Sequence, residues 1–183
     1  MMNLEIRKAS ASDWQAISDV VTAAFEGEGP EITKLIDGLL QDSSAYPLLS
    51  LVATIHDHVV GHILFTNTQI KHAQQTVSSA ILAPLAVHPN HQNQGVGAQL
   101  IREGLKQLKT AGVELVFVLG HPDYYPKHGF SAAGIKGFEA TYPISPENAD
   151  AWMVQELHSG ALERVSGQVI CADTLNDPKY WRE

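Results

Sequence analysis

A glycine-containing loop near the middle of the chain has the residue types and spacing that bind phosphate. The loop, Gln92-Asn93-Gln94-Gly95-Val96-Gly97-Ala98, follows an apolar run at residues 81–87 and opens an amphipathic segment. Small residues at such a turn let backbone N–H groups converge on an anion, and the following helix N-terminus adds a favourable dipole. No acidic side chain lies between Val87 and Arg102. We predict an anion-binding loop; the alternative is a tight turn that uses glycine only to reverse the chain.

The two best-known nucleotide-binding loops do not fit this stretch. A P-loop would place Lys-Ser or Lys-Thr after the glycines, and the dinucleotide fingerprint would add a third glycine, whereas Ala98-Gln99-Leu100 follows here. The stretch resembles motif A of the GCN5-related N-acetyltransferase (GNAT) family, which is Q/R-x-x-G-x-G/A after a central strand. Residues 92–98 match this motif position by position, and Leu85-Ala86-Val87 matches the end of the family's splayed fourth strand.

This resemblance implies a site for acetyl-CoA as a cosubstrate. In the family the loop amides hold the pyrophosphate, a role that would fall here to residues 92–98. The backbone of the splayed strand pairs with the pantetheine arm, which would involve Leu85, Ala86 and Val87. A backbone amide near these three residues would hold the acetyl oxygen and stabilise the oxyanion.

A second motif, Tyr124-Tyr125-Pro126-Lys127-His128-Gly129-Phe130, follows the next predicted strand. It resembles the family's short helix in which a tyrosine stands four residues before Gly-Phe, and Tyr125 occupies that position. A departing coenzyme thiolate needs a proton. The thiol that it becomes resembles a cysteine thiol, with a pKa of about 8.5, and a phenol with a pKa of about 10 can donate to the developing anion. We predict that Tyr125 is the general acid; the alternative is a tyrosine that only packs on the sheet. Lys127-His128 replaces an Arg-aromatic pair that is frequent in the family.

The residue that accepts the proton of the attacking amine is left open. Many family members use a carboxylate on the central strand, but residues 76–87 contain no Asp or Glu. His88 and His121 stand at the ends of the two predicted central strands, and histidine is the usual general acid or base in enzymes. Either can relay a proton through water, and the alternative for each is a structural role. Cys171 lies far from both motifs, and direct transfer needs no covalent nucleophile.

The amino-acid composition limits which binding partners and which cellular compartment we expect. The formal charge of −8 argues against direct nucleic-acid binding, which needs a basic face, while a local basic lining around a coenzyme stays compatible. One cysteine allows no internal disulfide, and no apolar run reaches membrane-spanning length or forms a signal-peptide core. We expect a cytoplasmic protein with no membrane partner. His56 and His58 are too few ligands for a metal site, so no metal is expected.

Apolar periodicity predicts the elements that position these motifs. A first strand precedes two helices, with Glu26 and Glu28 in the connection between the helices; these carboxylates are either solvated or in contact with the substrate amine. A hairpin then leads into the central strand, the glycine loop, a helix that ends at Gly112 and a further strand parallel to the central one. The expected ranges are 4–7, 14–25, 32–40, 48–55, 59–65, 76–87, 100–108 and 113–119.

The last third of the chain is less regular. We predict strands at 130–135, 151–157 and 168–172, with a loop at 137–150. The ending Asn176-Asp177-Pro178-Lys179-Tyr180-Trp181 resembles the tail of a bacterial subset called YhbS-like acetyltransferases. Four aromatic residues are expected to pack in the core or, alternatively, to line the acceptor side: Phe138, Tyr142, Trp152 and Trp181.

The resemblance implies an α/β fold of the GNAT (acyl-CoA N-acyltransferase) type: a mixed twisted sheet with splayed central parallel strands and helices on both faces. We expect residues 1–183 to form one domain, with the acetyl-CoA site in 1–145 and strands and a tail in 146–183. The predicted function is transfer of an acetyl group from acetyl-CoA to a primary amine of a small molecule or protein, by direct attack in a ternary complex. A non-catalytic acyl-CoA sensor or interaction module is the alternative, and a homodimer through the C-terminal strands is compatible.

Overall fold

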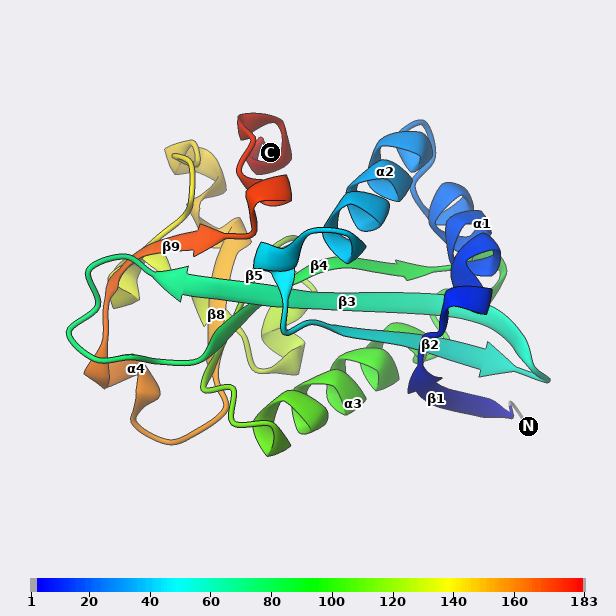
Figure 1. Cartoon of the computed structure of the whole chain (residues 1–183), viewed down its shortest axis with the longest axis horizontal. Helices are drawn as coiled ribbons and strands as arrows, with labels where there is room; N and C mark the ends of the chain where they lie inside the picture. Colours follow the sequence, from blue (N-terminus) through cyan, green and yellow to red (C-terminus); the bar gives the residue numbers. More distant parts are fainter. Residues whose placement is uncertain (1–2, 183) are drawn as a thin grey trace.

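A mixed β-sheet organises the molecule in the computed structural model, which describes residues 3–182. Its strand order is β1-β2-β3-β4-β5-β8-β6, and β9 pairs with both β3 and β7. Figure 1 shows the long β3 running across the molecule, with its neighbours on either side. The strands are β1 (Leu4–Lys8), β2 (Leu49–Ile55), β3 (His58–Ile70), β4 (Ser79–Val87), β5 (Leu115–Leu119), β6 (Ser131–Ala132), β7 (Phe138–Glu139), β8 (Trp152–Glu156) and β9 (Gly167–Cys171).

Helices cover both faces of this sheet, as predicted. The helices α1 (Trp14–Ala24) and α2 (Gly29–Leu40) lie on one face, and α3 (Val96–Thr110) lies on the other (Figure 1). Alternate residues of the strands therefore enter two separate cores, one with the α1–α2 pair and one with α3. The helix α3 packs closely because Gly104 faces Phe65: a Cβ at residue 104 would lie 2.3 Å from the ring. A short helix, α4 (Ala161–Arg164), precedes β9.

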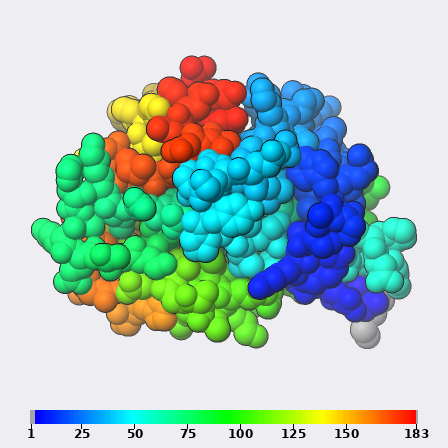
Figure 2. Space-filling view, in the orientation of Figure 1, coloured from blue at the N-terminus to red at the C-terminus, as the bar shows by residue number. Residues whose placement is uncertain are grey.

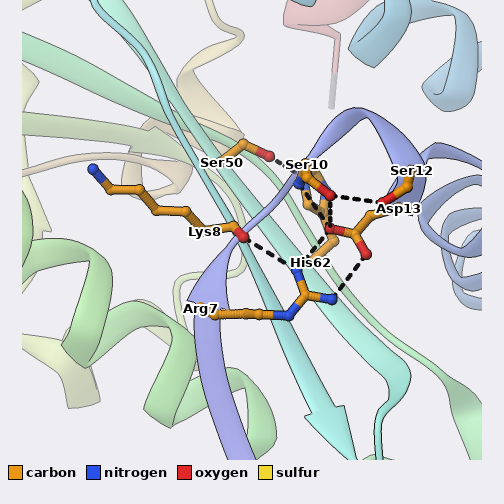
Figure 3. A network of polar contacts seen from close by, with 7 residues as sticks. All are labelled: Arg7, Lys8, Ser10, Ser12, Asp13, Ser50 and His62. Atoms are coloured by element: carbon orange, nitrogen blue, oxygen red, sulfur yellow. Dashed lines mark hydrogen bonds and ion pairs between the residues drawn. The ribbon is translucent and has the colours of Figure 1, made fainter.

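A polar network fixes the start of α1 against β1 (Figure 3). The two guanidinium nitrogens of Arg7 donate to the two carboxylate oxygens of Asp13 at 2.7 and 2.9 Å. Asp13 also accepts from the backbone N–H of Ser10 at 2.7 Å, which forms the capping box at this helix start. The Arg7 hydrogen bond, opposed in part by burial, lowers the pKa of Asp13 below its usual range. Ser10 is the N-cap of the 3₁₀ turn Ala11–Asp13, which leads directly into α1.

His62, on β3, is fully buried beside this network (Figure 3). Its Nε2 lies 2.9 Å from the hydroxyl of Ser50, whereas its Nδ1 has no partner among the described residues. Burial lowers the pKa of His62 from 6.5 to about 4. The unfolded chain therefore binds more protons than the folded chain between these two values, so stability falls as the pH drops from 6.5 towards 4.

Replacing His62 by a non-titrating residue should remove this pH dependence. We expect the free energy of unfolding of the wild-type chain to fall by about 2 kcal/mol more between pH 7 and pH 5 than that of His62→Gln. Glutamine can still hydrogen-bond Ser50, and Asp13 loses its charge only at lower pH, outside this interval. Denaturant unfolding at the two pH values measures the difference; equal pH dependence of the two proteins would contradict the assignment to His62.

The central strands part at a defined point. β4 and β5 are parallel and pair only from Ser79↔Leu115 to Leu82↔Val118. Beyond Leu82, β4 follows β3 alone, and the register between β3 and β4 shifts where Ala83 and Pro84 lie. Proline has no N–H to give to a ladder, and an irregular register bends a strand. The splayed parallel strands expected from the resemblance are thus confirmed, and Pro84 marks where they separate.

Sequence reasoning was less accurate after β5. The strand expected at 130–135 is limited to Ser131–Ala132, because the chain turns through Gly134–Lys136 and reaches a positive φ at Gly137. The expected loop at 137–150 contains β7 and the start of a 3₁₀ helix, Pro146–Ala151. β3 also continues five residues past the predicted end at residue 65, because β9 pairs with its end.

Both β8 and β9 have strand partners on both sides within the chain. A homodimer, which is still a prediction, would therefore need another surface.

Within residues 3–182, no helix combines the length and apolar character needed to cross a membrane. The same residues contain no cluster of three or more His, Cys, Asp or Glu side chains placed to hold a metal ion. His56 and Asp57, both at positive φ, form the tight turn between β2 and β3.

Candidate functional site

A cavity of about 560 Å³ opens where β4 and β5 separate. Its floor is the parting point itself, with Pro84 on one side and the end of β5 on the other. The remaining walls come from the α1–α2 junction, from Tyr125 and from the C-terminal segment. Figure 2 shows this C-terminal segment, in red, beside the α2 region, although the two are far apart in sequence. The volume lies in the range of small-molecule sites.

Tyr125 projects into this cavity from a short 3₁₀ helix, Tyr125–His128, placed directly after β5. Its ring lies over Gly120, where a Cβ would approach ring atom Cε2 to 2.5 Å, so only glycine permits this position. The side chain is buried, and burial, with a smaller effect of Tyr124, raises the pKa of its hydroxyl above 10. The phenol is therefore fully protonated at neutral pH and available as a donor.

Tyr124 points to a different part of the site. Its ring meets that of Tyr125 edge to face at 5.2 Å, but its hydroxyl reaches the first turn of α3. A Cβ at Gly97 would lie 2.7 Å from this hydroxyl, so the second glycine of the loop makes room for it. The two adjacent tyrosines therefore lie at different places: Tyr125 lines the cavity, and the Tyr124 hydroxyl lies beside Gly97 of the glycine loop.

The glycine loop has the form of an anion site. Gly95, at φ 85°, is the N-cap of α3, and no atom lies within 4 Å of where its Cβ would be. The side-chain amides of Gln92 and Gln94 donate to the carbonyls of Val87 and Asn90 at 3.0 and 3.3 Å, which braces the loop from within. Within the described chain, the N–H groups of residues 96–98 have no hydrogen-bond acceptor. Three free amides at a helix N-terminus can hold a phosphate.

The two candidate histidines occupy different environments. His121 lines the cavity, and its carbonyl accepts from the backbone N–H groups of Tyr124 and Tyr125 at 3.1 and 3.3 Å. His88 is outside the cavity lining: its Nδ1 accepts from the N–H of Asn90 at 3.1 Å and caps a 3₁₀ turn. Of these two histidines, His121 is the one that lines the cavity.

A small basic groove lies on the other side of Tyr124. Arg102, Lys127 and His128 line it, together with Ile101 and Leu105 of α3. Burial and, to a smaller extent, the positive charges of Arg102 and Lys127 lower the pKa of His128. The local basic lining around a coenzyme that the sequence allowed stays a prediction, and this groove is a candidate for it.

Several cavity residues were not identified from the sequence. Glu28 was considered, but Glu31, one turn further along α2, was not. Lys179 and Arg182 also line the cavity, and no local pattern links them to the glycine loop or to the motif at Tyr125, both far earlier in the sequence. Four aromatic residues were expected to pack in the core or, alternatively, to line the acceptor side, and among them Trp181 is the one that lines the cavity. Trp152 stacks on Phe117 at 5.4 Å in the core, Phe138 packs against the same ring, and Tyr142 donates to Asn176.

A splayed pair of parallel strands, a glycine loop at the end of the first and a tyrosine after the second define an acyl-CoA-dependent transferase. Residues 5–133 match the sequence profile of the acetyltransferase (GNAT) domain. The chain belongs to the GNAT family and is an N-acetyltransferase.

Relatives from Escherichia coli and Brucella melitensis agree with this assignment. The chain is 46% identical to the uncharacterized N-acetyltransferase YjhQ from Escherichia coli strain K12, over 91% of this chain and 89% of the relative. It is 30% identical to the uncharacterized N-acetyltransferase YhbS of the same strain, over 93% and 98%. The crystal structure of E. coli YhbS in complex with CoA superimposes with a TM-score of 0.86 at 28% identity, covering 97% and 94%. A GNAT acetyltransferase from Brucella melitensis in complex with acetyl-CoA gives 0.74 at 28% identity, covering 94% and 98%.

Proposed function

We propose that this N-acetyltransferase moves the acetyl group of acetyl-CoA to a primary amine by direct attack in a ternary complex. The observation that carries the proposal is the cavity at the parting of β4 and β5, with Tyr125 in its wall and the glycine loop at the end of β4. The pyrophosphate would lie on the free amides of residues 96–98, and the pantetheine would run along Leu85, Ala86 and Val87. The relatives whose structures contain CoA and acetyl-CoA support the choice of coenzyme.

The reaction needs two proton movements. The amine nitrogen attacks the thioester carbonyl carbon, a C–N bond forms, and the resulting oxyanion is held by a backbone amide near Leu85. Collapse of this intermediate breaks the C–S bond, and Tyr125 gives its proton to the departing sulfur. The nitrogen loses its proton to His121 through water. His121 fits this role better than His88, whose Nδ1 already accepts a backbone hydrogen bond outside the cavity.

The alternative is a non-catalytic acyl-CoA sensor. A sensor needs the glycine loop to bind the coenzyme, but it does not need a protonated phenol in the wall of the cavity between β4 and β5. The buried Tyr125 and a cavity with room for an acceptor support the enzyme, as do the relatives, which are named as acetyltransferases.

Ligand-induced stabilisation is the first test of the coenzyme. We expect acetyl-CoA and CoA to raise the melting temperature in a concentration-dependent way, because a ligand that binds only the folded chain adds about 2.7 kcal/mol of stability at 100 times its Kd. A screen of amines that detects thiol release then measures transfer. Absence of any shift with acetyl-CoA, CoA or longer acyl-CoAs would refute the coenzyme site. Stabilisation without amine-dependent thiol release would favour the sensor.

A further inference from the structure

The acceptor cavity carries opposite charges on two walls. Among the described residues that line it, those with full charges are Glu28 and Glu31, around the start of α2, and Lys179 and Arg182, in the C-terminal segment. Two carboxylates therefore face two cations around one cavity, and its formal charge is zero in a chain of net charge −8. Between the charged rims, the floor is aliphatic and comes from residues 81–85 of β4 and Leu119.

These four charges do not neutralise one another. The ion pairs within residues 3–182 are Arg7–Asp13 and Arg164–Glu114, so neither glutamate is paired with either cation of the cavity. The ammonium group of Lys179 instead lies 5.1 Å from the centre of the Tyr180 ring. Charges that have no ion-pair partner around a cavity are available to a ligand. A ligand can pair with the carboxylates and with the cations at once only if it carries both a positive and a negative charge.

Hydrogen bonds join the C-terminal segment to the residues that follow α2. Asp42, just after α2, accepts from the N–H and hydroxyl of Thr174 at 2.9 and 2.7 Å, and the Ser44 hydroxyl accepts from the N–H of Asp173 at 2.8 Å. Burial alone would raise the pKa of Asp42, but hydrogen bonds from Ser44 and Thr174 lower it to about 2, so it stays charged. Trp181 is buried between Lys179 and Arg182, and its indole N–H donates to the carbonyl of Leu175 at 2.9 Å.

We propose that the acceptor is a small zwitterion, a molecule with a primary amine and an anionic group such as an amino acid. Its amine is attracted by Glu28 and Glu31, and its anionic group pairs with Lys179 and Arg182. A monocation would leave both basic side chains unpaired, and a dication would be repelled by them. The inference rests on the proposed acetyl transfer and names the class of substrate that this same cavity takes.

Matched amines that differ only in the carboxylate test the proposal. The pairs are lysine with 1,5-diaminopentane, 4-aminobutanoate with butylamine, and leucine with leucinamide, each assayed by thiol release at saturating acetyl-CoA. We expect kcat/KM to be about 10-fold higher for at least one zwitterion than for its partner, as suits charge pairs that are partly open to water. The double variant Lys179→Met/Arg182→Met should remove this preference.

Two further variants keep the test independent of folding. Lys109→Met removes the same charge from the exposed end of α3, outside the cavity, and should leave the preference unchanged. Lys179→Glu should raise the use of 1,5-diaminopentane relative to lysine, a gain that loss of structure does not produce. Melting temperatures with acetyl-CoA confirm that each variant still binds the coenzyme.

The outcomes separate the two proposals. Equal use of the matched pairs, no turnover of any zwitterion by a protein that binds acetyl-CoA, or a preference that survives Lys179→Met/Arg182→Met would each overturn the zwitterion assignment. The coenzyme site would stand in all three cases. Failure of acetyl-CoA to stabilise the wild-type chain would overturn the coenzyme site itself.

Discussion

Replacing Tyr125 with phenylalanine should lower kcat by about 10²- to 10⁴-fold, the usual contribution of a positioned general acid. The change removes one oxygen atom and leaves the ring over Gly120 and against Phe130, so the fold should be retained. Loss of the proton donor acts on departure of the thiolate and not on coenzyme binding. We therefore expect the Kd for acetyl-CoA to stay within a few-fold of wild type. Steady-state kinetics and a binding titration measure the two quantities separately.

Tyr124→Phe is the matched control for this change. It removes the same atom from the adjacent ring, but the Tyr124 hydroxyl lies at Gly97 in the first turn of α3 and not in the cavity. Its loss should change coenzyme affinity more than kcat. If Tyr124→Phe abolished turnover and Tyr125→Phe did not, the general acid would be Tyr124 and our assignment to Tyr125 would be wrong. If neither did, the proton would come from elsewhere.

A negative charge at Gly95 should strongly weaken coenzyme binding. We expect Gly95→Asp to raise the Kd for acetyl-CoA by about 100-fold relative to Gly95→Asn, since adjacent like charges cost several kcal/mol and about 1.4 kcal/mol is tenfold. Both side chains tolerate the positive φ of this residue and both are good N-caps, so the two variants share their effects on folding. The site above Gly95 is open, so neither side chain meets a neighbour.

The dependence of the two affinities on salt concentration provides a check on this comparison. The difference between Gly95→Asp and Gly95→Asn should shrink as ionic strength rises, because exposed charges are screened. Gly97→Asp would be a less direct test, since any side chain at residue 97 meets the Tyr124 hydroxyl as well as the ligand. Equal affinities of the two residue 95 variants at low salt would mean that the pyrophosphate does not lie on this loop.

The sequence by itself contained the local patterns on which the proposed coenzyme site rests. Glycines at 95 and 97, a tyrosine four residues before Gly129 and an apolar strand before each motif are local patterns, and together they lie within residues 81–130. Such patterns specify local backbone conformation: a left-handed N-cap, a helix start, a strand end. The parallel pairing of β4 and β5 also followed, because a helix between two adjacent strands makes a crossover.

Only the tertiary structure decided the acceptor half. Glu31 and Arg182 are 151 residues apart in the sequence, and they line one cavity because Asp42 and Ser44 bind the C-terminal segment against α2. β8 and β9 enter the sheet beside β5 and β3 in an order that no short pattern encodes. Local residue types fix local geometry, whereas the shape and charge of a cavity depend on long-range packing of segments whose individual patterns are compatible with many arrangements.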